Sequence, residues 1–387
     1  MKRRWTIYFW IFTGLLGLTV FCLWFFHFRF IRFTYDAYVE GNRVVVNAEE
    51  KTIVTKIYSD DTFFVKKGEL LIETDPTLYR IRLEKAKENL ALRVREVCRM
   101  VHDMFALKAD IAYWDAFLLR AVQDLQKREQ VIGIGGVSLE DLEHARAAVR
   151  EGASKLESTK SMVKKEAAMV QGTSIFCNPL VVAASEEMKA AWVKLYRTKV
   201  YAPVSGLVAQ RKIQVGMRVE EGEPLLSIIP LDQIWVNANF KETQMKHMKI
   251  GQRVKLYSDM YGRSVMYYGH IVGLPGGAGN AFSLLPPQNL SGNWIKIVQR
   301  LPVRVAIDTG PLKRYPLRIG MTMHAIVSVR DRSGPYFTTS QSETPRYITQ
   351  VFSEETAGVA EEIEKIMQDN IDPALTFFGV NPVPGEG

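Results

Sequence analysis

The chain has 387 residues, of which 47% are hydrophobic and 24% are charged, the proportions of a folded protein with two or three domains. Three cysteines are too few for a disulfide framework, and no CxxC or HExxH spacing indicates a metal site. The net charge is +8. Because the basic residues are scattered, a solvated basic surface is favoured over a nucleic-acid site.

Residues 5–26 contain no charged residue. At 1.5 Å per residue they form a helix of about 33 Å, which is enough to cross a bilayer. The basic residues at positions 2–4 favour a cytoplasmic N-terminus. A cleaved signal peptide is the alternative, but the run ends in WFFH at 24–27, without a small-residue cleavage site. We therefore expect a cytoplasmic stub at 1–4 and an uncleaved transmembrane anchor at 5–28, with the remaining chain outside the cytoplasm.

An internal repeat follows the anchor. The string VKKGELLI at 65–72 matches VEEGEPLL at 219–226 without gaps, and the match extends over about 48–72 and 202–226. Each copy has short Val/Ile/Leu strands and a glycine suited to a tight turn. Chance recurrence of a common turn pattern is the alternative. One copy is too small to bury a core, so we expect both to form one β-sandwich from 29–75 and 199–230.

The insertion between the copies, residues 76–198, has a helical pattern. Apolar residues recur every seven positions from Leu83 to Ile132, which indicates a coiled coil. Glycines interrupt this pattern, and Ser138 restarts a helix as a capping residue would, with Asp141 in the position of the usual Glu or Gln. Two arms of about 55 residues predict an antiparallel hairpin of about 80 Å with its tip at 133–138. Such a hairpin is either a rigid spacer or a docking rod.

A second break is expected in the returning arm, between Gly172 and Pro179. Cys98 and Cys177 lie on opposite arms of the hairpin. Their spacing allows either a disulfide or two buried free thiols.

The remaining chain divides into a β-rich segment and a tail. Alternating polar and apolar residues at 234–240, 253–257, 302–307 and 320–329 predict a small antiparallel β-barrel over 231–330. Residues 331–387 are acidic, with three basic and ten acidic residues. Within this tail, 353–369 is amphipathic and places Val359, Ile363 and Ile366 on one face.

Several long strings give the sequence a family resemblance. They are DAYVEGN at 36–42, DDT at 60–62 with VKKG at 65–68, APVSG at 202–206, QIWVNANFKETQ at 233–244, GNAFSLLPPQN at 279–289 and NWIKIVQRLPV at 293–303. With this order of parts, residues 1–330 resemble the HlyD family of periplasmic adaptors, or membrane fusion proteins, and its EmrA branch. The resemblance implies an α+β fold: an N-terminal transmembrane helix, a split lipoyl-like β-sandwich with an inserted coiled-coil hairpin, and a small antiparallel β-barrel.

The resemblance also implies a function. EmrA-like proteins are single-pass inner-membrane proteins with most of the chain in the periplasm. They join a major facilitator drug/proton antiporter to a TolC-like outer-membrane channel and assemble as homo-oligomeric rings. An adaptor of an ABC-type exporter is the alternative within this class. A coiled-coil envelope scaffold without a transport role is the alternative from another class.

The resemblance makes the hairpin tip the channel-docking end. Relatives often carry an Arg…Leu…Ser pattern there, and in this chain Lys127, Val131 and Ser138 occupy that spacing. Arg128 and Ile132 lie directly beside it. Lys in place of Arg and Val in place of Leu depart from the family pattern. These departures put the particular contacts with the channel in doubt, but they do not affect the prediction that the tip is the docking end.

No catalytic, cofactor or metal site is expected. The coiled coil replaces the hairpin on which a lipoyl or biotinyl carrier would hold its lysine. The glycine-rich loop at 273–279 fits neither a dinucleotide nor a Walker pattern. Met245, His247 and Met248 lie near one another in the sequence. We interpret this grouping as incidental rather than as a soft-metal site. Phe282 and Trp294, on a barrel loop, are the candidates for a ligand or partner site, with a structural role as the alternative.

Overall fold

The fold is that of a computed structural model, which describes residues 2–26, 28–170, 172, 174–278, 298–312, 314–338 and 344–376. The chain forms two compact units. The first contains Met1–Ala48, Lys56–Ile72 and Tyr201–Val351, and the second contains Glu49–Thr55, Glu73–Val200 and Phe352–Gly387. The predicted α+β class is confirmed, because both units combine the predicted helices and strands.

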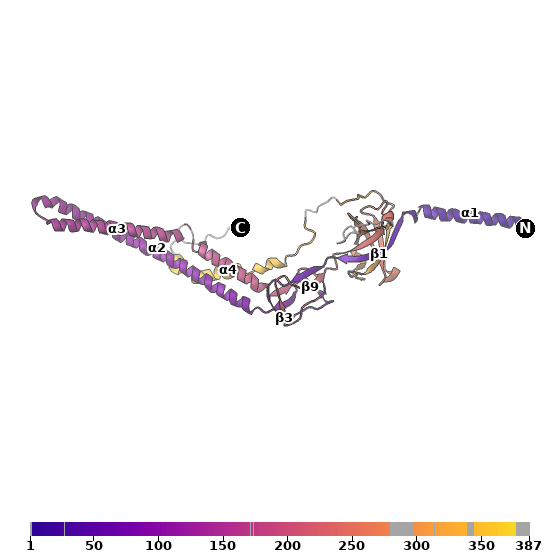
Figure 1. The fold of residues 1–387 in the computed structure, drawn as a ribbon, viewed down its shortest axis with the longest axis horizontal. Coiled ribbons are helices and arrows are strands. Elements are labelled where there is room, and N and C mark those ends of the chain that lie inside the picture. The colour runs from indigo at the N-terminus through magenta and orange to yellow at the C-terminus, as the bar shows by residue number, and fades with distance from the viewer. Residues whose placement is uncertain are drawn as a thin grey trace, which may run out of the picture. The chain divides into compact units, whose positions relative to one another are not determined.

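The chain begins with one long helix, α1 (Lys2–Phe26), which Figure 1 draws without interruption. In the part of the chain that the structure describes, one helical stretch is long and apolar enough to span a membrane, Phe9–Phe26 within α1. None of this stretch is buried inside the protein. Its apolar side chains therefore need a nonaqueous surrounding, as the anchor prediction requires.

A closed barrel of six strands follows the order β1-β10-β13-β12-β11-β14. Its strands are β1 (Ile31–Gly41), β10 (Ile234–Lys241), β11 (Arg253–Ser258), β12 (Tyr267–Gly273), β13 (Arg300–Ile307) and β14 (Thr322–Ser328). Alternate residues of each strand face the core, as Val236, Ala238 and Phe240 do in β10. The predicted barrel is confirmed, but β1 was wrongly assigned to the sandwich, because its pairing with β10 joins segments about 200 residues apart.

Two of the family-specific strings lie side by side on β1 and β10. Asn42 Nδ2 donates a hydrogen bond to Gln233 Oε1 at 2.8 Å, and Asn239 Nδ2 donates to Asp36 Oδ1 at 3.0 Å. Arg300 Nη1 lies 2.8 Å from the other oxygen of Asp36. These polar side chains therefore help to fix the register of β1 against β10.

The β-sandwich has two four-stranded sheets, ordered β2-β9-β7-β4 and β6-β5-β3-β8. An offset of about 154 residues converts the strands of one sheet into those of the other. The strands are β2 (Val44–Asn47), β3 (Thr52–Ile57), β4 (Phe64–Val65), β5 (Leu70–Thr74), β6 (Lys199–Tyr201), β7 (Gly206–Ala209), β8 (Arg218–Val219) and β9 (Pro224–Ile229).

The turn glycines confirm that the repeat is structural. Gly68 has a φ of 81° and donates its amide to Ala202 O at 2.8 Å. Gly222 has a φ of 82° and donates to Ala48 O, also at 2.8 Å. A positive φ of this size strains any residue with a Cβ. The shared string V-x-x-G-E therefore encodes the same turn twice, and each turn bonds to the opposite copy.

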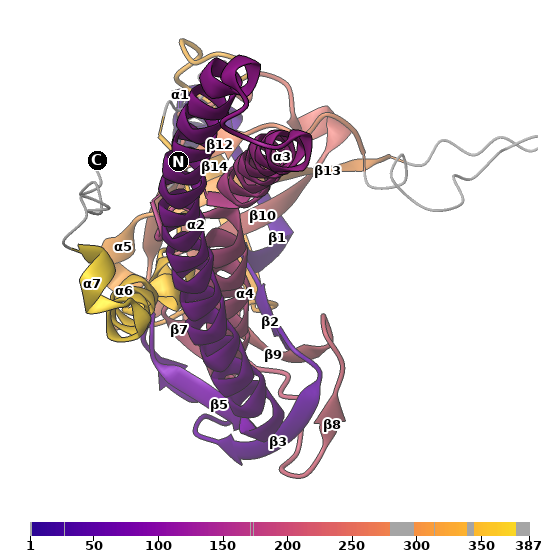
Figure 2. The same ribbon diagram turned by 90° about the vertical axis from the view of Figure 1, so that its left-hand side faces the viewer.

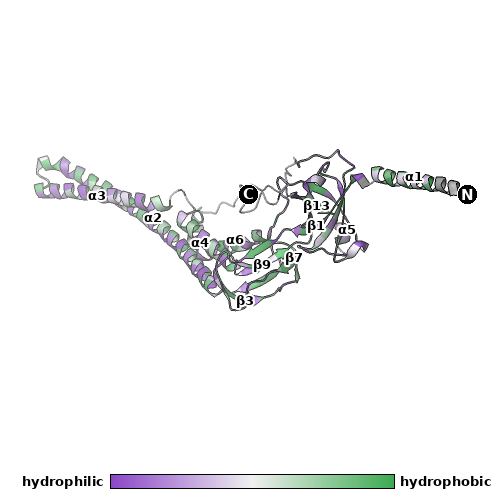
Figure 3. Cartoon of the chain, turned by 45° about the vertical axis from the view of Figure 1, so that its right-hand side comes forward, coloured by the Kyte–Doolittle hydropathy of each residue, from purple (hydrophilic) through white to green (hydrophobic). Residues whose placement is uncertain are grey.

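The helical hairpin consists of α2 (Thr77–Val131), α3 (Leu139–Val170) and α4 (Pro179–Tyr196). In Figures 1 and 2, α3 and α4 lie alongside α2, and Figure 3 shows hydrophilic and hydrophobic residues alternating along α2 and α3. The predicted break between 172 and 179 separates α3 from α4. There Asn178 caps α4 by accepting from Leu180 N at 3.0 Å, and donates to Met169 O at 2.9 Å.

The two hairpin cysteines are both free, so the disulfide alternative does not hold in this structure. Cys98 is buried and Cys177 is exposed, which makes the expectation of two buried thiols wrong for Cys177. Burial raises the pKa of the Cys98 thiol, because the thiolate loses its hydration there. Cys98 is therefore an inert core residue that would react only after the surrounding helices open.

The acidic tail is not a free extension of the chain. Helix α6 (Val359–Asn370) packs against α2 and α4 and buries Val359, Ile363 and Met367 in their apolar cluster. Figure 2 shows α6, in yellow, beside α2. The predicted amphipathic face is confirmed in outline, but Met367 is its third buried residue, and Ile366 is only partly buried. Shorter helices flank α6: η6 (Val351–Thr356) and α7 (Pro373–Thr376).

Ion pairs before and within α6 hold the tail to the hairpin. Arg197 donates three hydrogen bonds to Glu355, whose side chain is buried; the Nη2–Oε2 distance is 3.0 Å. Lys87 Nζ lies 2.8 Å from Glu362 Oε1. The pKa of Glu362 is below its usual value because Lys87 donates to its carboxylate. Two acidic residues of the tail, Glu355 and Glu362, therefore face basic residues of the hairpin.

Acidification is expected to weaken the docking of the tail. Lys87 lowers the pKa of Glu362 from 4.5, and the Ala374 amide, followed by His102, lowers that of Asp372 from 3.8. A lowered native pKa stabilises the folded state above the unfolded pKa, and this stabilisation is lost as the pH falls through the native pKa. Docking should therefore be constant between about pH 5 and 7 and weaken below about pH 4.5. Hydrogen exchange of the α6 amides, corrected for intrinsic rates, measures this; lost protection already between pH 7 and 5 would contradict it.

Candidate functional site

The hairpin tip is built from the end of α2, a short turn and the start of α3. The turn is η2 (Ile132–Ile134), followed by Gly135, whose φ of 79° reverses the chain. Ser138 Oγ accepts a hydrogen bond from Asp141 N at 3.0 Å and donates to Asp141 Oδ2 at 2.7 Å. The predicted capping residue is thus confirmed, and Asp141 takes part in the cap through its carboxylate.

Arg128 joins the two arms at the tip. Its Nη1 donates to Asp141 O at 3.0 Å, and its Nε lies 3.0 Å from Asp124 Oδ2. The pKa of Asp141 is lowered, mainly by the Ser138 hydroxyl and also by the Arg128 charge. The Arg128 guanidinium therefore makes its contacts within the tip, where its main role is to stabilise the turn.

The structure brings together all five tip residues that the sequence singled out. Lys127 and Ser138 are exposed, whereas Arg128, Val131 and Ile132 are half-buried. Among the described residues Lys127 has no ion-pair partner, so its charge faces solvent. The docking role of these five side chains stays a prediction.

Leu139 is the tip residue that sequence reasoning missed. It begins α3 directly after the cap, and its side chain is 76% exposed. An apolar residue immediately after a cap serine was the available signal, since the first turn of a helix is usually polar. We call Lys127, Val131, Ile132, Ser138 and Leu139 the tip surface. It combines an exposed leucine with an uncompensated positive charge.

The other predicted candidates, Phe282 and Trp294, lie outside the described residues. Of the three residues weighed as a soft-metal site, Met248 is fully buried in the barrel core. Within the described ranges, no three His, Cys, Asp or Glu side chains are grouped as metal ligands.

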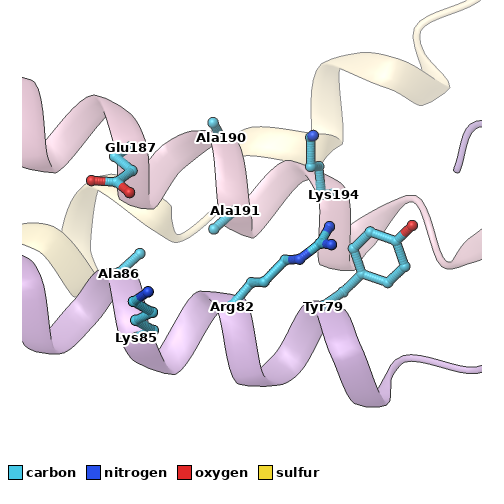
Figure 4. A pocket seen from close by; sticks show the side chains of 8 residues that line it. All are labelled: Tyr79, Arg82, Lys85, Ala86, Glu187, Ala190, Ala191 and Lys194. Carbon is cyan, nitrogen blue, oxygen red and sulfur yellow. The ribbon is translucent and has the colours of Figure 1, made fainter.

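A basic cleft lies between α2 and α4 and has a volume of about 320 Å³. Arg82 and Lys85 of α2 and Glu187 and Lys194 of α4 line it, and Figure 4 shows Arg82 extending from α2 towards α4. Three cations against one carboxylate give it a positive potential. None of the lining side chains forms a nucleophile–base pair, so the cleft can attract anions but has no groups for catalysis.

A second cavity, of about 440 Å³, lies on the outer surface of the barrel. We call it the barrel cavity. His324 forms part of its wall: its ring stacks on Tyr257 at 4.4 Å between centroids, and its Nε2 lies 2.6 Å from Asp259 Oδ1. The lining residues are Ile31, Phe33, Thr34, Tyr35, Tyr257, Arg263, Met266, His324, Ala325 and Ile326. No sequence motif could indicate this site, because distant strands contribute its residues.

Comparison with known proteins agrees with this architecture. A family model described as "EMRA, alpha-helical hairpin domain" matches residues 77–198. The multidrug export protein EmrA of Escherichia coli strain K12 is 38% identical over 347 residues, covering 90% of this chain and 89% of that protein. The chain belongs to the EmrA family of membrane fusion proteins.

Other EmrA-family relatives cover most of the chain as well. The fatty acid resistance protein FarA of Neisseria gonorrhoeae is 40% identical over 322 residues, covering 83% of this chain and 82% of that protein. The solved structure of the periplasmic adaptor protein EmrA has a TM-score of 0.40 and 18% identity, over 77% of this chain and 98% of that one. Membrane fusion proteins are adaptors rather than enzymes, and α1 fits the inner-membrane anchor of such a protein.

Proposed function

We propose that this EmrA-family protein is the periplasmic adaptor of a tripartite drug efflux system. It joins a major facilitator drug/proton antiporter in the inner membrane to a TolC-like channel in the outer membrane. The observation that carries the proposal is the hairpin: residues 77–198 match the EmrA hairpin, and α2 alone runs for 55 residues. A helix of this length spans about 80 Å, which suits a component that bridges two partners.

In this proposal α1 is a single-pass anchor with a cytoplasmic N-terminus, and the hairpin extends into the periplasm. The chain acts in a homo-oligomeric ring, and the transporter supplies the energy. Its own task is to dock and to hold the two membrane proteins in line.

The tip surface is the proposed docking site for the channel. Leu139 is 76% exposed at the point where the chain reverses, and an exposed leucine at a rigid turn can fill an apolar pocket on a partner. Lys127 adds an uncompensated charge one helical turn before Val131. Arg128, by contrast, is expected to act indirectly, by holding the turn that presents Leu139.

In-cell crosslinking tests the proposal. A photoreactive amino acid at Leu139 should capture a TolC-like outer-membrane channel. The matched control is the same residue at Tyr113, which is 63% exposed at mid-hairpin. Channel capture from 139 and not from 113 is the expected result. No capture from 139, with the protein present in the membrane fraction, would contradict tip docking and favour the envelope-scaffold alternative.

Leu139→Asp is expected to lower efflux-dependent drug resistance by about tenfold or more. Removing a central apolar contact costs about 2 kcal/mol at an interface hot spot, and a buried aspartate adds a desolvation cost. The growth-inhibitory drug concentration measures this in a strain that lacks the native gene. Leu119→Asp is the control, since Leu119 is exposed on α2 away from the tip. Equal resistance in both variants would argue against the proposed site.

The class of transporter needs a separate test. Detergent extraction and affinity purification of the full chain should recover a major facilitator transporter. Recovery of an ATP-driven exporter would instead support the ABC-type alternative. Unchanged drug sensitivity after gene deletion, together with a defective envelope, would favour a scaffold.

A further inference from the structure

The barrel cavity has an aromatic mouth. Phe33 and Tyr35 lie on β1, and their side chains are 51% and 60% exposed. Their rings meet edge to face at 5.4 Å between centroids. Two exposed aromatic side chains on one strand offer a large apolar area that water does not favour. The mouth of the cavity is therefore suited to an apolar ligand.

Deeper in the cavity the wall is aromatic and rigid. Tyr257 is buried, and its ring stacks almost parallel to that of His324, at an angle of 4°. Tyr35 meets the same imidazole edge to face at 4.9 Å. Asp259 holds the ring from the other side through Nε2. The cavity is thus preformed, which lowers the cost of ordering side chains when a ligand binds.

The wall of the cavity contains one arginine, Arg263. The Arg263 guanidinium lies 5.4 Å from the centroid of the Tyr257 ring. Among the described residues Arg263 has no ion-pair partner, whereas the carboxylate of Asp259 is bonded to His324. An arginine held over an aromatic ring can still donate several hydrogen bonds to a phosphate. The cavity therefore combines an apolar interior with an anion-binding group at its edge.

The position of the cavity in the chain indicates where such a ligand comes from. Ile31, which lines the cavity, is only five residues after Phe26, the last residue of α1. Five residues span at most about 18 Å, so the cavity lies close to the membrane surface when α1 is inserted. Between them, the Arg29 guanidinium packs on Phe25 at 4.7 Å and on Phe30 at 4.9 Å. Aromatic and arginine side chains of this kind are typical of the headgroup region.

We propose that the barrel cavity binds an anionic phospholipid of the membrane that holds α1, with the lipid phosphate at Arg263 and apolar atoms against Phe33, Tyr35 and Met266. A cavity of about 440 Å³ holds part of a lipid, its glycerol region or one chain segment, while the rest stays in the bilayer. Lipid binding would fix the barrel at the membrane surface. This inference depends on the anchor in the proposed function, but not on channel docking.

Photocrosslinking of the full chain in its native membrane tests the inference. A benzoylphenylalanine residue is placed at Phe33, and the control carries it at Tyr268. Both side chains are 51% exposed on the barrel, but Tyr268 does not line the cavity. After irradiation, mass spectrometry of the modified peptide identifies the captured molecule. A phospholipid mass on residue 33 and none on residue 268 is the expected result, with at least fivefold less adduct in Arg263→Gln.

The possible results distinguish a failure of the lipid-binding inference from a failure of the proposed function. If alkaline carbonate releases the chain from the membrane, the anchor itself is wrong. If the chain stays in the membrane and residue 33 captures no lipid, the barrel cavity is not a lipid site. Equal capture at residues 33 and 268 reflects general contact with the bilayer and also overturns the inference. Capture of a protein, or of a small exported amphiphile, replaces the lipid with another occupant.

A second measurement avoids any photoreactive substitution. Native mass spectrometry of the full chain in detergent, with added phosphatidylglycerol, should show one retained lipid per chain. Phosphatidylcholine, which has no net charge, should be retained at least fivefold less. Arg263→Gln should abolish the difference between the two lipids. An unchanged preference in that variant would show that Arg263 does not bind the headgroup.

Discussion

Replacing Gly206 by alanine is expected to destabilise the sandwich by about 3 kcal/mol or more. A Cβ added at this position would lie 2.4 Å from Ile229 O and 2.7 Å from Ile229 C. Both are backbone atoms of β9, the strand paired with β7, so a side-chain rotation cannot relieve the clash. The two strands must move apart, which weakens their hydrogen bonds and the packing beneath them. Denaturant unfolding of the full chain in detergent, followed by circular dichroism, measures this loss.

The repeat supplies a matched control for this substitution. At an offset of 154 residues the counterpart of Gly206 is Thr52, which has a Cβ and is buried in β3. Thr52→Ala removes the γ-methyl group and the hydrogen bond from Thr52 Oγ1 to Asp75 O, which together are expected to cost about 1–2 kcal/mol. A variant Gly206→Ala as stable as the wild type would show that β7 and β9 are not as close as the structure has them.

The parts of the fold that the sequence predicts are those with a local signal. The sandwich repeat could be recognised because each half must form the same glycine turn, so Gly68 and Gly222 share a valine three residues before and a glutamate directly after. The helices of the hairpin could be recognised because a coiled-coil seam places an apolar residue every seventh position. Both signals come from backbone geometry that repeats along the chain.

The parts that the sequence does not predict depend on contacts between distant segments. The residues of β1 have the alternation of any half-buried strand, and only the closed barrel shows that they pair with β10 and β14. The barrel cavity is hidden for the same reason, because β1 contributes four of its residues, β14 three and β11 one. At the tip, the Lys127–Val131–Ser138 spacing predicted a docking surface, but the contacts of Arg128 and the exposure of Leu139 could be seen only in the turn itself.

The packing of the acidic tail could not be predicted from the sequence for the same reason. Its amphipathic pattern predicted a helix with one apolar face, but no local signal could show that the base of the hairpin covers that face. The basic residues that meet it, Lys87 and Arg197, are themselves more than 150 residues away from their partners. A charge pattern along one segment shows that a partner exists and leaves its identity open.

Replacing Ile363 by aspartate is expected to release the tail from the hairpin, at a cost of about 3–5 kcal/mol. Ile363 is buried on α6 among apolar residues of α2 and α4. The substitution removes an apolar side chain from a packed cluster and would place an unpaired charge there. The control is Ala360→Asp, which adds the same charge to an exposed position on the same helix and should cost little.

The native cysteines provide the measurement for this prediction. Cys98 is buried beside the end of the tail, near Asp372, whereas Cys177 is exposed. A thiol that reacts only when its cover opens is labelled at a rate set by the population of the open state. Ile363→Asp should therefore raise the rate of maleimide labelling at Cys98 by about tenfold or more, with the rate at Cys177 unchanged. If Cys98 stays protected while Cys177 reacts, the tail does not cover it, and the contacts within α2, α3 and α4 alone must hold the base of the hairpin closed.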